Sequence, residues 1–213
     1  MPSIAEILRS LYGAWRLLVV DRHGILAFDG TRSAALRSFW VAIVVLPVII
    51  ALDVTVGQDD TVVAPHGIWL LLANCVLRWV LPLIVFYWLI RWYGRGDRYW
   101  LLVAALNWSQ IPQILLSLLE TGLFLGAKQF VDLGTMQGAT EIATIAGGAM
   151  ALSALLVHFI VINFYEWFVA WIALEAGFAL PTAVLLFDLV IGNGIDYGFD
   201  HFLPVLAQSA HVG

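Results

Sequence analysis

The sequence predicts an all-α, polytopic membrane protein with five transmembrane helices and an N-terminal amphipathic helix at the membrane interface. Composition and hydropathy lead to this fold class. Of the 213 residues, 62% are hydrophobic and only 12% are charged, whereas a soluble domain is about half apolar and about a quarter charged. The mean hydropathy is +0.93. So few charged residues cannot cover the surface of a globular protein in water, so lipid must solvate much of the surface.

Residues 1–37 are expected to form a cytoplasmic amphipathic helix followed by a turn segment. Ser3 and Glu6 have the spacing of a capping box, which favours a helix that begins at Ser3. Apolar side chains then recur at helical spacing, at Ile4, Ile7, Leu8, Leu11, Trp15 and Leu18. Arg9 and Arg16 can reach from the flanks of such a helix toward water. These features indicate a helix that lies in the membrane interface; packing on another protein domain is the alternative.

Five apolar segments within residues 38–205 are expected to form a five-helix transmembrane domain. Crossing about 30 Å of hydrocarbon takes about 20 residues of helix, and backbone polar groups in lipid must be paired within the helix. The segments cover about 38–56, 67–92, 99–125, 141–164 and 181–202. The fourth apolar run continues to about residue 176, and we expect 165–176 to lie at the interface. Residues 206–213 are expected to form a short tail.

The Lys and Arg residues predict the orientation of these spans. Five Arg residues precede the first span and three lie between the second and third, whereas the segments on the opposite side contain only Lys128. Arg78 falls inside a span. Because cytoplasmic loops carry an excess of Lys and Arg, we expect the N-terminus in the cytoplasm and the C-terminus outside.

The third predicted span contains an unusual polar stretch, Asn-Trp-Ser-Gln-Ile-Pro-Gln, at residues 107–113. On a helix, its polar side chains begin a stripe about 140° wide. The stripe consists of Asn107, Gln110, Gln113, Ser117, Glu120 and Thr121, and the opposite face carries Ile111, Leu115, Leu118 and Leu119. Polar side chains inside a span face other helices or a water-filled cavity. We therefore expect the stripe to face inward and the leucines to meet lipid.

Polar residues on four of the spans form a candidate intramembrane polar cluster. Its members are Asn74, Arg78, Asn107, Gln110, Gln113, Glu120, His158, Asp188 and Asp196. At about 1.5 Å of rise per residue, Asn107, His158 and Asp188 lie at similar depths, so we expect them to meet beside Gln110. Arg78 lies near the midplane and needs an acceptor, for which Asp188 is the expected choice. The cluster either joins the helices by hydrogen bonds or lines a path for a ligand or an ion.

Small residues on two spans have the spacing that permits close approach of helices. Ala143, Gly147 and Ala151 lie four residues apart on the fourth span, as do Gly194 and Gly198 on the fifth. Such positions let two helix backbones come close together in a membrane.

Two partial motifs near the C-terminus suggest chemistry but are incomplete. Gly192, Asp196 and Asp200 match the second half of the metal-binding signature of CDP-alcohol phosphotransferases, but residues 170–187 lack the Asp residues and the Ala-Arg pair of the first half. Gly-Asn-Gly-Ile-Asp at 192–196 resembles the Gly-x-Gly-Asp of intramembrane aspartyl proteases, but Ile195 interrupts it. We therefore expect no catalytic residue, cofactor or metal site. A metal-dependent phosphotransferase is the remote alternative.

The layout resembles the Yip1-domain family of small, five-span integral membrane proteins. The stretch GAWRLLVVDRHGILAFDGTRSAALRSFWVAIVVLP at 13–47 is similar to the entry to the first span in bacterial members. The Asp-Leu-Tyr-Gly-Pro signature of eukaryotic members is absent, and Ser-Leu-Tyr-Gly-Ala at 10–14 only echoes it. The resemblance implies a non-catalytic protein that binds partners in the membrane or shapes it, and it supplies no catalytic residues. We expect the protein in the bacterial cytoplasmic (inner) membrane.

Two classes of function fit these observations. The first is association in the membrane, with lipids as partners and with another membrane protein or a second copy of the chain. The second is a small transporter or channel that uses the polar cluster, although five spans do not divide into the equal halves of many transporters. A net charge of −5 argues against a nucleic-acid partner, because nucleic acids are bound through clustered Lys and Arg.

The predicted orientation can be tested by labelling single cysteines in a Cys75→Ala background, since Cys75 is the sole cysteine. Cysteines placed at Asp60 and Gln208 should react with an impermeant thiol reagent added to intact cells, because both positions are expected outside. A cysteine at Gly96 should react only after the cells are broken. Labelling of Gly96 together with protection of Asp60 would invert the orientation.

Overall fold

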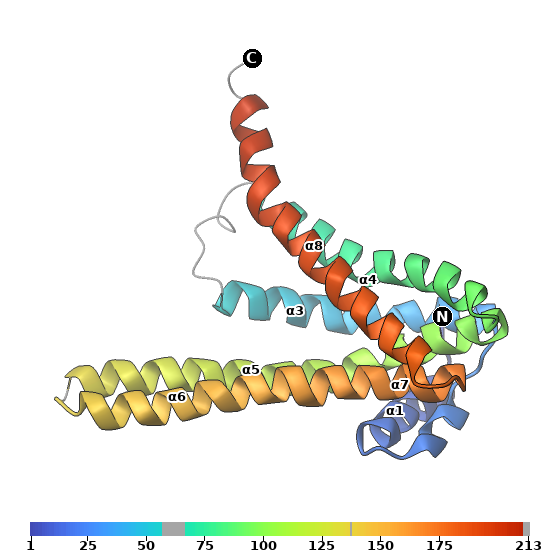
Figure 1. The fold of residues 1–213 in the computed structure, drawn as a ribbon, viewed down its shortest axis with the longest axis horizontal. Coiled ribbons are helices and arrows are strands. Elements are labelled where there is room, and N and C mark those ends of the chain that lie inside the picture. The colour runs from blue at the N-terminus through green and yellow to red at the C-terminus, as the bar shows by residue number, and fades with distance from the viewer. Residues whose placement is uncertain (57–66, 137, 211–213) are drawn as a thin grey trace.

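The computed structural model describes residues 1–56, 67–136 and 138–210, and nearly all of these residues are helical (Figure 1). No strand occurs among them. Five helical segments are long and apolar enough to cross a membrane, namely Arg32–Leu52, Leu72–Trp92, Gly96–Met136, Thr140–Leu174 and Ala179–Phe199. The predicted fold class, an all-α polytopic membrane protein, is confirmed.

The helices follow one another along the chain with short connections. The N-terminal part contains α1 (Ile4–Leu18), the 3-10 helix η1 (Arg22–Ala27), α2 (Arg32–Ser38) and the 3-10 turn η2 (Phe39–Val41). Then come α3 (Ala42–Val56), α4 (Gly67–Trp92), the 3-10 turn η4 (Gly96–Arg98) and α5 (Tyr99–Met136). The last part contains α6 (Thr140–Leu156), the π-helical turn η5 (Val157–Ile162), α7 (Asn163–Leu174) and α8 (Ala179–Ala210).

Helix α1 is amphipathic, and its two faces have different surroundings. Its start is capped as predicted, because the Ser3 hydroxyl accepts a hydrogen bond from the Glu6 backbone N–H at 3.1 Å. Both oxygens of the Glu6 carboxylate also accept hydrogen bonds from Arg37 Nε of α2 at 3.1 Å. One face packs on η1, α5 and α7 through Ser10, Gly13, Ala14 and Leu17. The opposite face leaves Ile4, Leu8, Tyr12 and Trp15 exposed.

Helix α5 runs further than the sequence predicted. The segment 126–136, which was expected to be a loop after the third span, continues α5 to a length of 38 residues, or about 57 Å. Residues 165–174 continue the fourth apolar run as helix α7, and their expected position at the membrane interface stays a prediction. Together α5 and the run from α6 to α7 form a long antiparallel hairpin (Figure 1). The pairing explains the added length, because each helix gives the other a packing surface.

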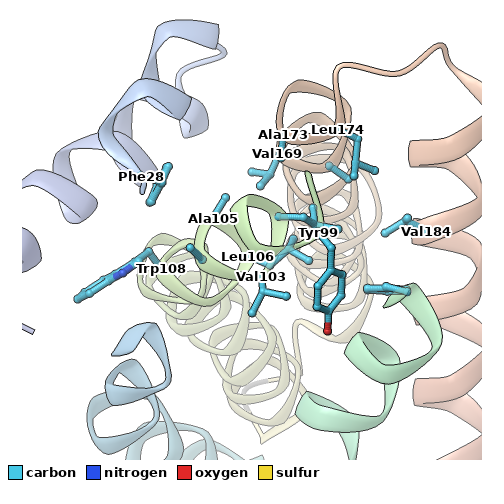
Figure 2. Packing of buried hydrophobic residues seen from close by; sticks show 14 of the residues in the cluster. Phe28, Tyr99, Val103, Ala105, Leu106, Trp108, Val169, Ala173, Leu174 and Val184 are labelled. Atoms are coloured by element: carbon cyan, nitrogen blue, oxygen red, sulfur yellow. The ribbon is translucent and has the colours of Figure 1, made fainter. Parts of the chain in front are cut away.

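The apolar core lies at the end of the hairpin where α1, η1 and α2 gather. Every residue from 102 to 109 of α5 is buried, and Figure 2 shows Ala105 and Trp108 of α5 with Phe28 above them and Val169 and Ala173 of α7 beside them. Farther along α5, Leu115, Leu118 and Leu119 are exposed on the face that was predicted to meet lipid. The molecule therefore has a packed end and a more open end.

Close contacts within the hairpin depend on small residues, as predicted for the fourth span. A Cβ atom added to Gly147 would lie 2.5 Å from Val131 Cγ2 and 3.0 Å from the backbone oxygen of Ala127. The corresponding expectation for the fifth span is wrong, because Gly194 and Gly198 have no neighbouring atom within 4 Å of such a Cβ. Helix α8 still contacts α4 at this level through Gly192 and Asp196, so Gly194 lies on another face of the helix.

Two adjacent glycines on α6 test this close approach. Gly147→Ala should lower the melting temperature in detergent, because overpacking a tight contact costs about 1–3 kcal/mol. Gly148→Ala is the matched control, since nothing lies within 4 Å of its added methyl group and alanine favours a helix over glycine by up to about 1 kcal/mol. Equal melting temperatures for the two variants would contradict the packing of α5 on α6.

Candidate functional site

Seven of the nine residues of the predicted polar cluster fall into three separate groups, and the other two, Gln110 and Gln113, belong to none of them. The first group, called the Asn107 network, consists of Asn107 and its hydrogen-bond partners Trp79 and Ser38, and it lies in the packed end. The Arg78 cluster contains Asn74, Arg78, Asp188 and Asp196 and lies between α4 and α8. The third group is the pair Glu120 and His158 on the hairpin. Gln110 and Gln113 lie on α5 between the first and third groups.

The Asn107 network joins three helices through buried, hydrogen-bonded side chains. Asn107 is 1% exposed, and its Oδ1 accepts a hydrogen bond from Trp79 Nε1 of α4 at 2.9 Å. Its Nδ2 donates to Ser38 Oγ at 2.7 Å, and the Ser38 hydroxyl donates to the backbone oxygen of Ala35 at 2.6 Å. The expected meeting of Asn107 with His158 and Asp188 is therefore wrong, because Asn107 faces the N-terminal helices instead.

A second buried contact, two residues along α5, ties α7 and α1 to the same helix. The Tyr165 hydroxyl donates to the backbone oxygen of Ala14 at 2.9 Å and lies 3.0 Å from Ser109 Oγ. Tyr165 and Ser109 are both buried. Sequence reasoning missed Tyr165, although a tyrosine inside an apolar run signals a hydroxyl that needs a partner. Asn107 and Ser109 thus explain why polar residues stand in this part of α5.

The rest of the stretch 107–113 is less well paired. Gln113 Nε2 is buried and has no hydrogen-bond partner among the described residues. Gln110 is partly exposed. The polar stripe is therefore not a continuous chain of hydrogen bonds along the helix, and only its first member, Asn107, is buried and hydrogen-bonded on both side-chain ends.

The Arg78 cluster centres on an ion pair between α4 and α8. Arg78 Nη1 donates to Asp196 Oδ2 at 2.5 Å, and Asn74 Nδ2 donates to Asp196 Oδ1 at 3.3 Å. Asn74 and Arg78 lie one helical turn apart, so each reaches one oxygen of the same carboxylate. The guanidinium lies beside Gly192, where an added Cβ would be 3.5 Å from Nη2. The expected pairing of Arg78 with Asp188 is wrong, because Asp196 lies two turns farther along α8 and reaches Arg78 directly.

Asp188 extends the Arg78 cluster toward α7. Its carboxyl group is close enough to interact electrostatically with Arg78 on one side and with Glu166 of α7 on the other. Glu166 was not among the nine predicted residues. Its depth could have suggested it, since Glu166 and Asp188 lie eight and nine residues from the neighbouring ends of α7 and α8. Glu166, Asp188, Arg78 and Asp196 therefore form a ladder of ionisable groups.

The ion pair of the Arg78 cluster is open to the outside of the chain. The Arg78 side chain is 51% exposed and the Asp196 side chain is 37% exposed. Both residues lie on segments that are long and apolar enough to cross a membrane. Charges are costly in hydrocarbon unless they are paired and screened from it, so this face needs water or protein over it.

The pair Glu120 and His158 connects α5 to the irregular part of the hairpin. His158 Nδ1 lies 3.2 Å from Glu120 Oε2. His158 belongs to the π-helical turn η5, and such turns inside α-helices occur often at functional positions. The contact shows that the polar stripe of α5 faces α6 and η5 at this level, while the leucines face away.

The arrangement gives no support to a metal-dependent reaction. Among the described residues, no three His, Cys, Asp or Glu side chains come together as a metal site. The carboxylate of Asp196, which the partial phosphotransferase motif would require as a ligand, is held by Arg78 and Asn74. The side chain of Asp200 lies outside the described residues.

Comparisons of the chain with protein-family models, with curated proteins and with solved structures found no match. The function must therefore be inferred from the three groups themselves.

A double-mutant cycle tests the ion pair between α4 and α8. Arg78→Leu and Asp196→Asn should each lower stability in detergent, because each leaves a charged partner without its counter-charge. The double variant should lose less than the sum of the two single losses, with a coupling of about 0.5–3 kcal/mol. The matched cycle with Asp188→Asn should show weaker coupling. Stronger coupling to Asp188 than to Asp196 would contradict the observed pairing.

Proposed function

We propose that this protein is a non-catalytic integral membrane protein that works by association with another membrane protein, for which a second copy of the chain is the simplest candidate. The half-exposed ion pair Arg78–Asp196 carries the proposal. Hydrocarbon cannot solvate the remaining donors of Arg78, so a partner helix with polar groups would lower the energy of this face. The proposed contact surface is the face of α4 and α8 around this pair.

The packed end supports association rather than passage through the protein. Buried polar side chains there hydrogen-bond one another and the backbone, as in the contacts from Asn107 to Trp79 and from Tyr165 to Ala14. A path for solute needs polar groups that are free to exchange partners with water. Dry, satisfied groups stiffen the bundle and present a fixed surface to a partner.

The finer assignment follows the resemblance found in the sequence. We propose a Yip1-like protein of the bacterial cytoplasmic membrane, with the N-terminus and α1 on the cytoplasmic side and the C-terminus outside. The exposed apolar side chains of α1, Ile4, Leu8, Tyr12 and Trp15, support an interfacial helix in contact with lipid.

A small transporter or channel is the second candidate, and the ladder of ionisable groups favours it. Glu166, Asp188, Arg78 and Asp196 connect α7, α8 and α4. Such rows of ionisable side chains serve as proton relays in transporters. Against this role, Arg78 Nη1 already pairs with Asp196 Oδ2 at 2.5 Å. The positive charge of Arg78 would oppose the binding of a cation at that position.

Site-specific photocrosslinking tests the association. A benzophenone amino acid in place of Leu81, three residues from Arg78 on α4 and partly exposed, should give a crosslinked product in cell membranes. A mass of about twice 23.5 kDa would identify a second copy of the chain. The matched control is Leu119, which is also exposed but belongs to α5 rather than to α4 or α8. Equal products at both positions, or none at Leu81, would contradict the proposal.

A flux assay separates the two candidate functions. Liposomes that contain the purified protein should leak protons and small anions no faster than protein-free liposomes, because we propose no open path. Asp188→Asn should leave this background unchanged. If the protein causes a reproducible flux and Asp188→Asn abolishes it, the ladder is a transport path and association is not the main function.

A further inference from the structure

A hollow lies between η1 and α7, away from the three polar groups described above. It has two adjoining parts of about 470 and 360 Å³, which share Arg22, His23, Trp171 and Ile172. Phe168 extends the floor of the first part, and Leu26 and Glu175 border the second. The α7 side of the hollow is therefore apolar and aromatic apart from Glu175, whereas Asp21, Arg22 and His23 line the side next to η1.

Among the described residues, Arg22 is the charged side chain at this hollow that lacks a counter-charge. Asp21 forms an ion pair with Arg16, and Glu175 forms one with Arg98, so both acids at the rim have counter-charges. Arg22 is exposed and has no hydrogen bond or ion pair within the described part of the chain. An arginine of this kind is suited to bind a phosphate oxygen, because its guanidinium presents several donors in one plane.

His23 is oriented by its neighbour. Its Nδ1 lies 3.0 Å from Asp21 Oδ1, and its backbone N–H donates to the same oxygen at 2.9 Å. The backbone N–H of His23 and the Arg16 guanidinium lower the pKa of Asp21 to about 2, so this carboxylate stays ionised and holds the ring. The other ring nitrogen, Nε2, is left for a second contact.

The hollow borders one end of a segment that is long and apolar enough to cross a membrane. Trp171 belongs to the last turn of the fourth membrane-spanning segment, Thr140–Leu174, and stacks on Trp167 with 5.5 Å between ring centroids. Tryptophans are enriched at the boundary between membrane and water. Val20 and Asp21 on the rim follow directly after α1, whose exposed apolar side chains point to the same interface.

We propose that this hollow binds an anionic phospholipid of the leaflet against which α1 lies. Arg22 and His23 contact the phosphate, and the glycerol and first acyl carbons lie along Trp171, Ile172 and Leu26. Arg22 and His23 on one side and the apolar residues of α7 on the other match the two halves of such a lipid, whereas free phosphate would use only Arg22 and His23. The inference is independent of the association through α4 and α8, because the hollow lies on another part of the molecule.

The test uses delipidated, purified full-length protein in detergent, titrated with phosphatidylglycerol or with phosphatidylcholine of the same acyl chains and followed by native mass spectrometry. Phosphatidylglycerol should bind more tightly. Arg22→Gln should weaken its binding about fivefold, the amount expected for one basic residue at an anionic membrane surface, and Arg22→Lys should restore most of the affinity. Leu26→Glu, at a side chain that is 78% exposed, should weaken binding without affecting the fold.

Arg9→Gln is the matched control, because it removes the same charge from an exposed position of α1 that does not border the hollow. It should change the affinity less than twofold, and millimolar inorganic phosphate should not displace the lipid. Equal losses in the Arg9 and Arg22 variants would show diffuse attraction and overturn the site. Equal binding of the two lipids, or displacement by phosphate alone, would overturn the assignment to an anionic phospholipid.

Discussion

The arrangement of the helices depends on two buried polar side chains on α5, Asn107 and Ser109. Leaving a buried donor or acceptor unpaired costs about 1–3 kcal/mol, so each must find a partner in a fixed place. Asn107 fixes α4 through Trp79 and α2 through Ser38. Ser109 meets Tyr165 of α7, whose hydroxyl also holds α1 at Ala14. These contacts select one arrangement of the helices, whereas apolar packing alone would tolerate many.

These contacts lie at the packed end of the molecule, whereas the other end is more open. At the packed end the N-terminal helices pack on α5, and the hollow lies there between η1 and α7. Toward the open end α8 diverges from the hairpin (Figure 1), which leaves the ion pair of Arg78 and Asp196 half-exposed. We propose that these two surfaces are functional, the ion pair for binding a protein and the hollow for binding a lipid. Both lie beside the buried contacts and not within them.

Hydropathy predicted the fold class and the five spans, because lipid imposes a length and a composition on every crossing. It did not predict the full length of α5, since residues 126–136 carry no proline to end a helix and find a partner in α6. The periodicity of α5 placed the polar residues on one face but did not identify their partners. Depth counting assumed helices of equal tilt, and the oblique course of α8 brought Asp196 rather than Asp188 to Arg78.

Hydrogen exchange in α2 is the most direct test of the central claim, that the buried polar residues Asn107 and Ser109 of α5 fix the helices around it. Backbone exchange of residues 32–38 can be followed by mass spectrometry in detergent, with Asn107→Leu compared with Gln110→Leu. The first should accelerate exchange in α2, because Ser38 loses its contact with α5. The second should not, because Gln110 is partly exposed outside this network. Equal exchange in the two variants would contradict the account.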